Sequence, residues 1–339
     1  MPQSNIGLFI VWRIFQRRAE SLAAKFDLSV KYYYFSWEEK TKLHKALSYI
    51  FKTVLTLRDM FRLKPSIIFI QLPPTPVLYI AIAFCKLTNC KLVADCHNAM
   101  IYSKWLSWPL AKLLLREADT LLVHNQDVEN YAKRFQLDAI TLHDPLPALT
   151  DRVGPDIRIQ YEFTKEDYVI VPWSFAPDEP IDELIRAAAS MPETVFVMTW
   201  FAEKLPANIK NNVPSNLVMT GYLNDNDFTA IFAQATAALV LTTREGTQPS
   251  GATEAIALSV PLILSDLKTT RRLYDDMPIY IDNSADGIRR GIQQAFTEQD
   301  EVKARVLAFK NLLSMRLEAE IEDVKSLLRI PDPPARITR

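Results

Sequence analysis

Short runs of apolar, often β-branched residues alternate along the chain with segments in which apolar residues recur every three or four positions. The short runs predict strands and the longer segments predict helices, because the two structures repeat their side-chain directions with periods of 2 and 3.6. In the first half the predicted strands are 7–11, 28–34, 66–70, 91–94, 120–123 and 139–142. The helical segments lie near 13–26, 38–62, 76–88, 103–117 and 126–135.

The second half repeats this alternation, with predicted strands at 168–171, 195–198, 217–220, 238–241, 262–264 and 279–281. Strands that alternate with helices are typical of doubly wound parallel sheets, so we expect an α/β protein with two Rossmann-like domains and a cleft between them. Prolines, Gly154 and aspartates gather in 143–156, which places the boundary there. The predicted domains are residues 1–150 and 151–298.

The tail predicts one long amphipathic helix over 299–330, which we expect to pack across both domains. Its apolar stripe is Val302, Val306, Phe309, Leu313, Leu317, Ile321, Val324 and Leu328.

The amino-acid composition places the chain among soluble globular proteins. The chain of 339 residues is 49% hydrophobic and 23% charged, as in ordinary globular proteins. Its three cysteines form no C-x-x-C pair, so we expect no disulfide framework and no metal site. The sequence has no basic leader before an apolar stretch, and prolines interrupt its one long uncharged segment, 66–85. We therefore expect a cytoplasmic protein.

Charge is unevenly distributed. Residues 1–64 carry twelve basic against five acidic side chains, whereas 151–339 carry twenty against twenty-eight. Aromatic residues gather in the same basic region, which suits a membrane interface or nucleic acid. The alternative is a solvated helix face above an aromatic core.

The familiar nucleotide motifs are missing, since neither G-x-G-x-x-G nor G-x-x-x-x-G-K-[ST] occurs. The loop after strand 238–241 is the candidate instead. Small residues around Ser250 and Gly251 lead into a helix, whose N-terminal N–H groups favour an anion. Arg244 adds a cation, and Glu254, expected on the first helical turn, can accept ribose or sugar hydroxyls. A plain helix cap with a favourably placed carboxylate is the alternative.

The second candidate cluster is Asp95, His97 and Asn98, at the carboxyl end of strand 91–94. His97 can act as a general base, with Asn98 as a positioner. Gln71, Pro73 and Pro74 follow the neighbouring strand, where an α/β domain keeps its reactive groups. The other histidines, His44, His124 and His143, have no comparable setting in the sequence.

The second half resembles the donor half of GT-B glycosyltransferases. The resemblance rests on 220–228, 238–241, the Arg244-Glu245-Gly246 segment, Glu254 and 260–266. It implies a nucleotide-sugar site bracketed by two glutamates, although the spacing of Glu245 and Glu254 is one residue longer than usual. The donor residues that we infer are Ser174, Tyr222, Arg244, Glu245, Gly246, Ser250, Gly251 and Glu254.

The first half is similar to the chitobiosyl-diphosphodolichol β-mannosyltransferases and their bacterial relatives. The similarity rests on 71–76 and 91–98, together with 174–179 in the second half. It implies that His97, Asn98 and Asp95 are catalytic and that Gln71, Pro73 and Pro74 bind the acceptor. Most retaining GT-B enzymes hold the diphosphate with an arginine and a lysine at 174–179, and this chain has neither.

The resemblance predicts a glycosyltransferase of the GT-B fold with no cofactor. The donor would be a GDP- or UDP-sugar, and the acceptor a lipid-linked saccharide or an oligosaccharide in polysaccharide or exopolysaccharide biosynthesis. The basic aromatic segment 38–62 would lie on the inner leaflet as a peripheral membrane contact, and no nucleic acid is expected. The alternatives are a non-catalytic scaffold and a sugar-nucleotide epimerase.

Overall fold

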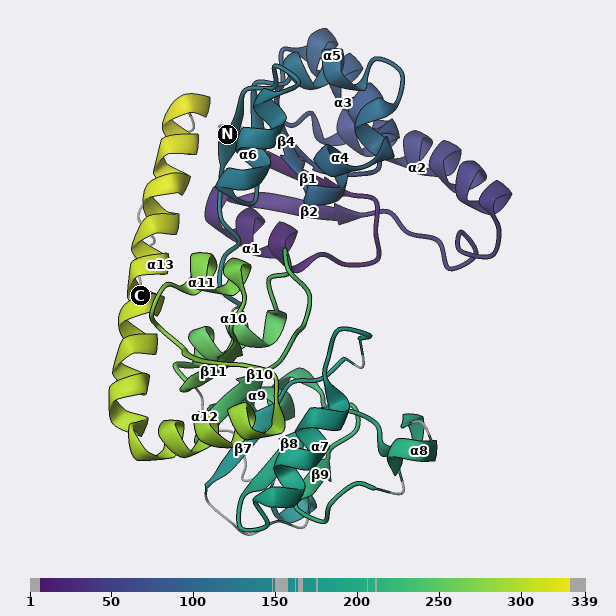
Figure 1. The fold of residues 1–339 in the computed structure, drawn as a ribbon. Coiled ribbons are helices and arrows are strands. Elements are labelled where there is room, and N and C mark those ends of the chain that lie inside the picture. Colours follow the sequence, from purple (N-terminus) through teal and green to yellow (C-terminus); the bar gives the residue numbers. More distant parts are fainter. Residues whose placement is uncertain are drawn as a thin grey trace, which may run out of the picture. The chain divides into compact units, whose positions relative to one another are not determined.

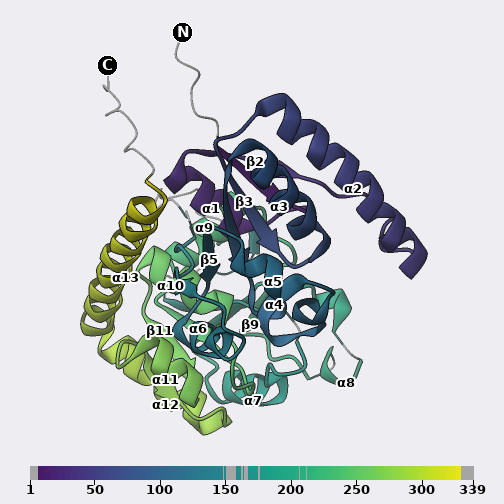
Figure 2. The same cartoon turned by 90° about the horizontal axis from the view of Figure 1, so that it is seen from above.

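The computed structural model describes residues 7–147, 149, 158–161, 163, 167–174, 176–205, 207–210 and 212–329. The chain divides into two compact units, which Figures 1 and 2 show in two views. The first unit comprises Met1–Pro145 and Met315–Arg339, and the second comprises Leu146–Ser314.

The first unit contains a parallel six-stranded sheet in the order β2-β1-β3-β4-β5-β6. Its strands are β1 (Gly7–Val11), β2 (Leu28–Tyr32), β3 (Ile67–Leu72), β4 (Lys91–Cys96), β5 (Thr120–Val123) and β6 (Ala139–Thr141). Its helices are α1 (Arg17–Phe26), α2 (Lys42–Leu63), α3 (Pro76–Thr88), α4 (Asn98–Tyr102), α5 (Ala111–Arg116) and α6 (Gln126–Lys133).

Both faces of this sheet are buried, since alternate side chains of one strand enter different hydrophobic clusters. Leu8 and Ile10 of β1 pack with α3, whereas Phe9 and Val11 pack with α1. A parallel sheet covered on both faces explains why its strands read as continuous apolar runs. The strand order reverses between β1 and β3. These two strands pair in parallel, with Gly7 opposite Ile67.

The second unit contains a parallel six-stranded sheet in the order β12-β11-β10-β7-β8-β9. Its strands are β7 (Tyr168–Val171), β8 (Val195–Met198), β9 (Leu217–Met219), β10 (Ala237–Val240), β11 (Leu262–Ser265) and β12 (Ile279–Ile281). Its helices are α7 (Ile181–Ser190), α8 (Ala207–Lys210), α9 (Asp225–Ala233), α10 (Ser250–Leu258), α11 (Lys268–Tyr274) and α12 (Ala285–Thr297). The strand order reverses between β7 and β10, which is where open α/β sheets bind ligands.

The long helix α13 (Gln299–Leu328) contributes to the core of both units. Val302, Val306 and Phe309 belong to the hydrophobic core of the second unit. The buried residues of its later turns, Leu317, Ile321, Val324 and Leu328, lie in the cluster of the first unit that contains α1. The apolar stripe predicted from the sequence is therefore the buried face of this helix, and Ile330 lies outside the described residues.

Several elements differ from their predicted bounds. The predicted helix 103–117 is broken into a 3₁₀ turn (Lys104–Ser107) and α5, since Pro109 cannot donate a helical hydrogen bond. Helix α2 begins at Lys42 rather than near residue 38, because Thr41 caps it by accepting a hydrogen bond from the backbone N–H of His44. Much of the predicted boundary segment, including Gly154, lies outside the described residues.

Among the residues that the structure describes, none of the helices has the length and apolarity needed to span a membrane.

Candidate functional site

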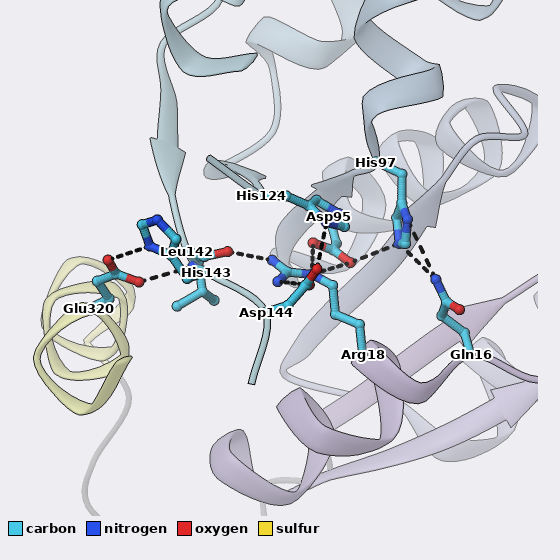
Figure 3. Close-up of polar contacts among 9 residues, drawn as sticks. All are labelled: Gln16, Arg18, Asp95, His97, His124, Leu142, His143, Asp144 and Glu320. Atoms are coloured by element: carbon cyan, nitrogen blue, oxygen red, sulfur yellow. Dashed lines mark hydrogen bonds and ion pairs between the residues drawn. The ribbon is translucent and has the colours of Figure 1, made fainter. Parts of the chain in front are cut away.

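A buried ion cluster lies beyond the carboxyl ends of β4 and β5 in the first unit (Figure 3). Arg18 of α1 donates from Nε to Asp95 Oδ1 at 3.0 Å and from Nη1 to Asp144 Oδ1 at 2.6 Å. Its Nη2 donates to the carbonyl oxygen of Leu142 at 2.9 Å. One guanidinium thereby ties α1 to the ends of β4 and β6.

His97 lies at the edge of this cluster, directly after β4, with its imidazole partly exposed. Its Nε2 is 3.6 Å from Asp95 Oδ2, and Gln16 Nε2 lies 3.2 Å from the same nitrogen. Gln16 Nε2 also lies 3.5 Å from Nδ1 of His97, and a neutral imidazole can accept a proton at one of its two ring nitrogens. The arrangement suits a general base that is held in place by Asp95 and Gln16.

His124, at the end of β5, contacts His97 edge to face with ring centroids 4.3 Å apart. Its Nδ1 is 3.2 Å from Asp144 Oδ2, and its Nε2 is buried with no hydrogen-bond partner among the described residues. Burial and the charge of Arg18 outweigh the attraction of Asp144 and lower the pKa of His124. The ring beside His97 is thus neutral near neutral pH.

Both carboxylates are stabilised in their charged form. Burial by itself would raise the pKa of Asp95, but the charge of Arg18 and the contacts with His97 and His124 hold it well below its ordinary value. Burial by itself would also raise the pKa of Asp144. The contacts with His124 and Arg18 outweigh this effect, and the pKa of Asp144 is lowered. The same two carboxylates overcome the cost of burial and raise the pKa of Arg18.

A metal ion is the other ligand that these side chains could hold. One donor atom each of Asp95, His97 and His124 lies within 4.8 Å of the others. The guanidinium of Arg18 already occupies Asp95 and places a positive charge beside that position, which disfavours a cation. We therefore keep the prediction of a site without metal.

The expected catalytic and acceptor residues differ in how far their side chains are exposed to solvent. Asn98 is exposed at the start of α4, next to His97. Asp95 is fully buried and lies beside His97, so its expected catalytic role stays a prediction. Gln71, Pro73 and Pro74 are also buried, and the side-chain amide of Gln71 has no partner among the described residues. These three offer no open surface to a large acceptor in this conformation.

Four residues of the cluster were missed by sequence reasoning: Gln16, Arg18, His124 and Asp144. Gln16 and Arg18 lie at the start of α1, whereas His124 follows β5 and Asp144 follows β6, so no local motif connects all four. The interpretation that His124 has no special setting is wrong, because tertiary packing brings it against His97. The only available signal was position, since His124 directly follows a predicted strand.

The second unit has a pocket of about 450 Å³ where the order of its sheet reverses. The loops that follow β7 and β10 form most of its wall. Five of the predicted donor residues line it together: Ser174, Arg244, Ser250, Gly251 and Glu254. Trp173, Asp178, Glu179, Phe228 and Thr242 are further lining residues that the sequence did not single out.

Helix α10 begins at the wall of this pocket. Its N-cap residue, Pro249, provides no side-chain hydrogen bond to the first N–H groups of the helix, of which that of Ala252 donates to the carbonyl oxygen of Pro249 at 3.2 Å. Gly251 allows the helix to approach the sheet, because a Cβ there would lie 3.0 Å from Pro172 and 3.1 Å from Val240. A helix N-terminus without a side-chain cap and Arg244 in one pocket favour an anionic ligand.

Glu254 lies in the second turn of α10, not in the first as expected, because the helix starts at Ser250. Its side chain lines the pocket but is largely buried, with 9% of its surface exposed. The interpretation of this stretch as a plain capping motif is therefore wrong. A buried carboxylate in a ligand pocket is well placed to accept hydroxyl groups.

The loop after β7 already binds a carboxylate of the protein itself, that of Glu179. The carboxylate of Glu179 accepts hydrogen bonds from the backbone N–H groups of Ser174 and Ala176, at 3.2 and 2.8 Å, and from the Ser174 hydroxyl at 2.9 Å. Asp178 accepts from the hydroxyl of Thr242 on the facing loop at 2.6 Å. Several donors of these loops are thus engaged within the protein, whereas the indole N–H of Trp173 has no partner among the described residues. Arg244 and the N-terminus of α10 line the same pocket.

Three predicted donor residues lie outside the pocket lining. Glu245 accepts from the backbone N–H groups of Lys268 and Thr269 at the start of α11. These bonds and that from the Thr269 hydroxyl lower the pKa of Glu245. The N–H of Gly246 also donates to Thr269 Oγ1, and Tyr222 is 78% exposed. Glu245 therefore acts as a helix cap in this structure, whereas Glu254 faces the pocket.

Comparison with known proteins connects this architecture to others. No protein-family model and no curated protein matches the sequence. Solved structures do match: Anabaena HepE (Alr3699) in complex with UDP and glucose has a TM-score of 0.65 at 11% identity, over 96% of this chain and 100% of that one. A glycosyltransferase from Rickettsia africae has a TM-score of 0.67 at 10% identity, over 96% and 99%.

An epimerase is similar to nearly the same degree. UDP-GlcNAc 2-epimerase from Neisseria meningitidis, bound to UDP-GlcNAc, has a TM-score of 0.62 at 11% identity, over 96% of this chain and 100% of that one. TM-scores of 0.62 to 0.67 over nearly the whole of each chain indicate a shared fold. The chain therefore has the GT-B fold, with two Rossmann-like domains.

Proposed function

We propose that this protein is a glycosyltransferase that moves a sugar from a nucleotide diphosphate-sugar to an acceptor hydroxyl. The second unit would hold the donor, and the first unit would hold the acceptor and supply the base. The observation that carries this proposal is the pocket between the loops after β7 and β10. There a helix N-terminus without a side-chain cap, Arg244 and the buried carboxylate of Glu254 line one space.

The chemistry needed is substitution at the anomeric carbon. The acceptor oxygen forms a bond to that carbon, the bond from carbon to the diphosphate oxygen breaks, and the diphosphate leaves with the electron pair. Arg244 and the α10 N-terminus stabilise the charge that develops on the leaving group. His97 takes the proton of the acceptor hydroxyl, with Asp95 and Gln16 holding its ring and Asn98 orienting the acceptor.

We propose that the acceptor is a lipid-linked saccharide or an oligosaccharide in polysaccharide biosynthesis. We also propose that the protein belongs with the mannosyltransferase-like enzymes that use such acceptors. The likeness of 71–76 and 91–98 to enzymes of that branch supports it. A lipid-linked acceptor would place the enzyme at the inner face of a membrane. The excess of basic residues in 1–64 is consistent with an anionic surface there.

The second candidate function is a non-catalytic binding protein built on the same fold. One observation favours it. The carboxylate of Glu179 occupies the N–H groups of the loop after β7, where most retaining GT-B enzymes place basic side chains. Such a protein would bind partners in a polysaccharide complex without binding a nucleotide.

Nucleotide binding separates the two candidates. We expect one of GDP, UDP, ADP, dTDP and CMP to bind the purified protein in calorimetry, with GDP or UDP preferred. Glu254→Ala is expected to weaken that affinity by about tenfold or more, since a buried carboxylate that accepts ligand hydroxyls is lost.

Glu245→Ala is the matched control, because it removes a glutamate from the same loop outside the pocket lining. Its nucleotide affinity should remain within about twofold of the wild type, apart from some loss of stability at α11. A folded protein that binds none of the five nucleotides would overturn the enzyme proposal and favour the scaffold. Equal losses in both variants would remove Glu254 from its proposed role.

A further inference from the structure

Helix α2 buries several polar side chains and leaves large apolar side chains exposed, although Met60 is buried and Tyr49, Leu57 and Leu63 pack partly against the core. Its buried residues are Ser48, Lys52, Thr56 and Met60. Leu43, Ile50 and Val54 are 67, 62 and 60% exposed. The full set of exposed large apolar side chains on this helix is Leu43, Leu47, Ile50, Phe51, Val54 and Phe61. An ordinary surface helix has the opposite orientation.

Specific polar contacts fix this orientation. Lys52, fully buried, pairs with Glu38 at 2.7 Å and donates to the carbonyl oxygen of Trp12 at 3.3 Å. Thr56 accepts a hydrogen bond from the indole N–H of Trp12 at 3.0 Å. Turning the helix to bury its apolar face would break these contacts and strand a buried charge. The outward apolar face is therefore a built feature of the first unit.

This face is large enough to matter. Helix α2 has 22 residues, which is a length of about 33 Å. Figures 1 and 2 show it along the rim of the first unit, with one side turned away from the sheet. A row of six exposed large apolar side chains along one helix marks an interaction site.

The charges on α2 indicate which kind of partner it meets. The helix carries Lys42, Lys45, Lys52, Arg58 and Arg62 against one acidic residue, Asp59. The carboxylate of Asp59 is engaged by Tyr33 at 2.9 Å and by Arg58. The helix keeps a positive excess, with Lys42, Arg58 and Arg62 exposed around the apolar face, and of these three Arg58 pairs with Asp59.

An apolar face with aromatic residues and a basic border is typical of a helix that lies in the plane of an anionic bilayer surface. A second copy of the chain would bring two positive borders together, which disfavours self-association. We propose that the outward face of α2, defined by Leu43, Leu47, Ile50, Phe51, Val54 and Phe61, is a docking surface for an anionic lipid leaflet. This deepens the proposed lipid-linked acceptor and rests on that part of the proposed function.

The test is sedimentation of the full-length protein with vesicles, measured without any substrate. We expect binding to vesicles of phosphatidylglycerol and phosphatidylcholine, weaker binding to phosphatidylcholine alone, and weakening by salt. Ile50→Glu with Val54→Glu should reduce the bound fraction by about tenfold or more. Arg58→Gln with Arg62→Gln should reduce binding several-fold on the anionic vesicles only.

Leu312→Glu with Met315→Glu is the matched control, since both residues are exposed and apolar but lie on α13. This variant should bind vesicles like the wild type. Circular dichroism and nucleotide calorimetry on the same samples report whether the fold and the donor site persist. A variant that loses vesicle binding but still binds nucleotide would then show that the substitutions act on the outward face of α2 and not on the fold or the donor site.

Three results would overturn the docking surface. The first is a wild-type protein that ignores anionic vesicles while still binding nucleotide. The second is an Ile50→Glu/Val54→Glu variant that binds vesicles normally. The third is a stable dimer in light scattering that this variant dissociates, which would assign the face to a second copy of the chain.

Discussion

Replacing His97 by glutamine is expected to lower turnover by about 10²-fold or more while leaving nucleotide affinity unchanged. His97 is the partly exposed member of the cluster, and it belongs to the first unit, whereas the nucleotide pocket belongs to the second. Positioned general bases typically contribute factors of this size. The measurement is the rate at which nucleoside diphosphate is released from the preferred sugar nucleotide in the presence of acceptor.

His44→Gln is the control for this variant, because His44 lies at the start of α2 and contacts Thr41 and Trp37 instead of the cluster. It should retain wild-type turnover. A soluble His97→Gln protein with wild-type turnover would remove His97 from the mechanism. A parallel loss of nucleotide affinity would show that the substitution acts on the structure rather than on the chemical step.

Replacing Arg18 by leucine is expected to lower the free energy of unfolding by about 3–5 kcal/mol. The arginine and Asp95 are almost completely buried, with side-chain exposures of 4 and 1%, so the substitution leaves a carboxylate buried without its partner. It also frees α1 from the ends of β4 and β6. Chemical denaturation followed by circular dichroism measures the change.

Two further variants make this result specific. Arg17→Leu changes the exposed neighbour on the same helix and should alter stability by about 0.5 kcal/mol or less. Arg18→Lys keeps the charge and should recover part of the loss. If Arg18→Leu were as stable as Arg17→Leu, the buried ion pair would have no net role in stability.

The ion pair of Arg18 and Asp95 also predicts that the free energy of unfolding depends on pH. The folded pKa of Asp95 is lowered, so the stabilisation is fully present above the unfolded pKa of about 3.9 and is lost as pH falls toward the folded value. The stability difference between wild type and Arg18→Leu should therefore be largest above about pH 4 and should shrink in acid. A difference that grows as the pH falls would contradict this assignment of charge.

Local patterns predicted much of the secondary structure because parallel strands buried on both faces leave a clear signal. The strand segments 7–11, 120–123, 168–171 and 195–198 were predicted with the bounds that the structure has. Boundaries failed where a single residue overrides periodicity, as Pro109 does within 103–117. The predicted α/β class is confirmed by two parallel six-stranded sheets.

Candidate residues near strand ends were found for the same reason, since parallel strands bring their carboxyl ends to one edge of a sheet. His97 was found in this way, whereas Glu254 was found from the loop of small residues that leads into a helix. Glu245 was grouped with Glu254 because the resemblance to GT-B glycosyltransferases implies two glutamates around the nucleotide sugar. In the structure the carboxylate of Glu245 caps α11, and the pocket is lined by Glu254.

The sequence by itself determined the order of strands and helices, the long C-terminal helix and the neighbourhoods of His97 and Glu254, because these depend on local periodicity and on position relative to a strand. Only the tertiary structure decided which residues surround His97, since Arg18 and His124 reach it from distant elements. It also decided that α2 faces outward with its apolar side. Periodicity defines an apolar stripe but not its direction, and here the buried pair of Lys52 and Glu38 fixes that direction.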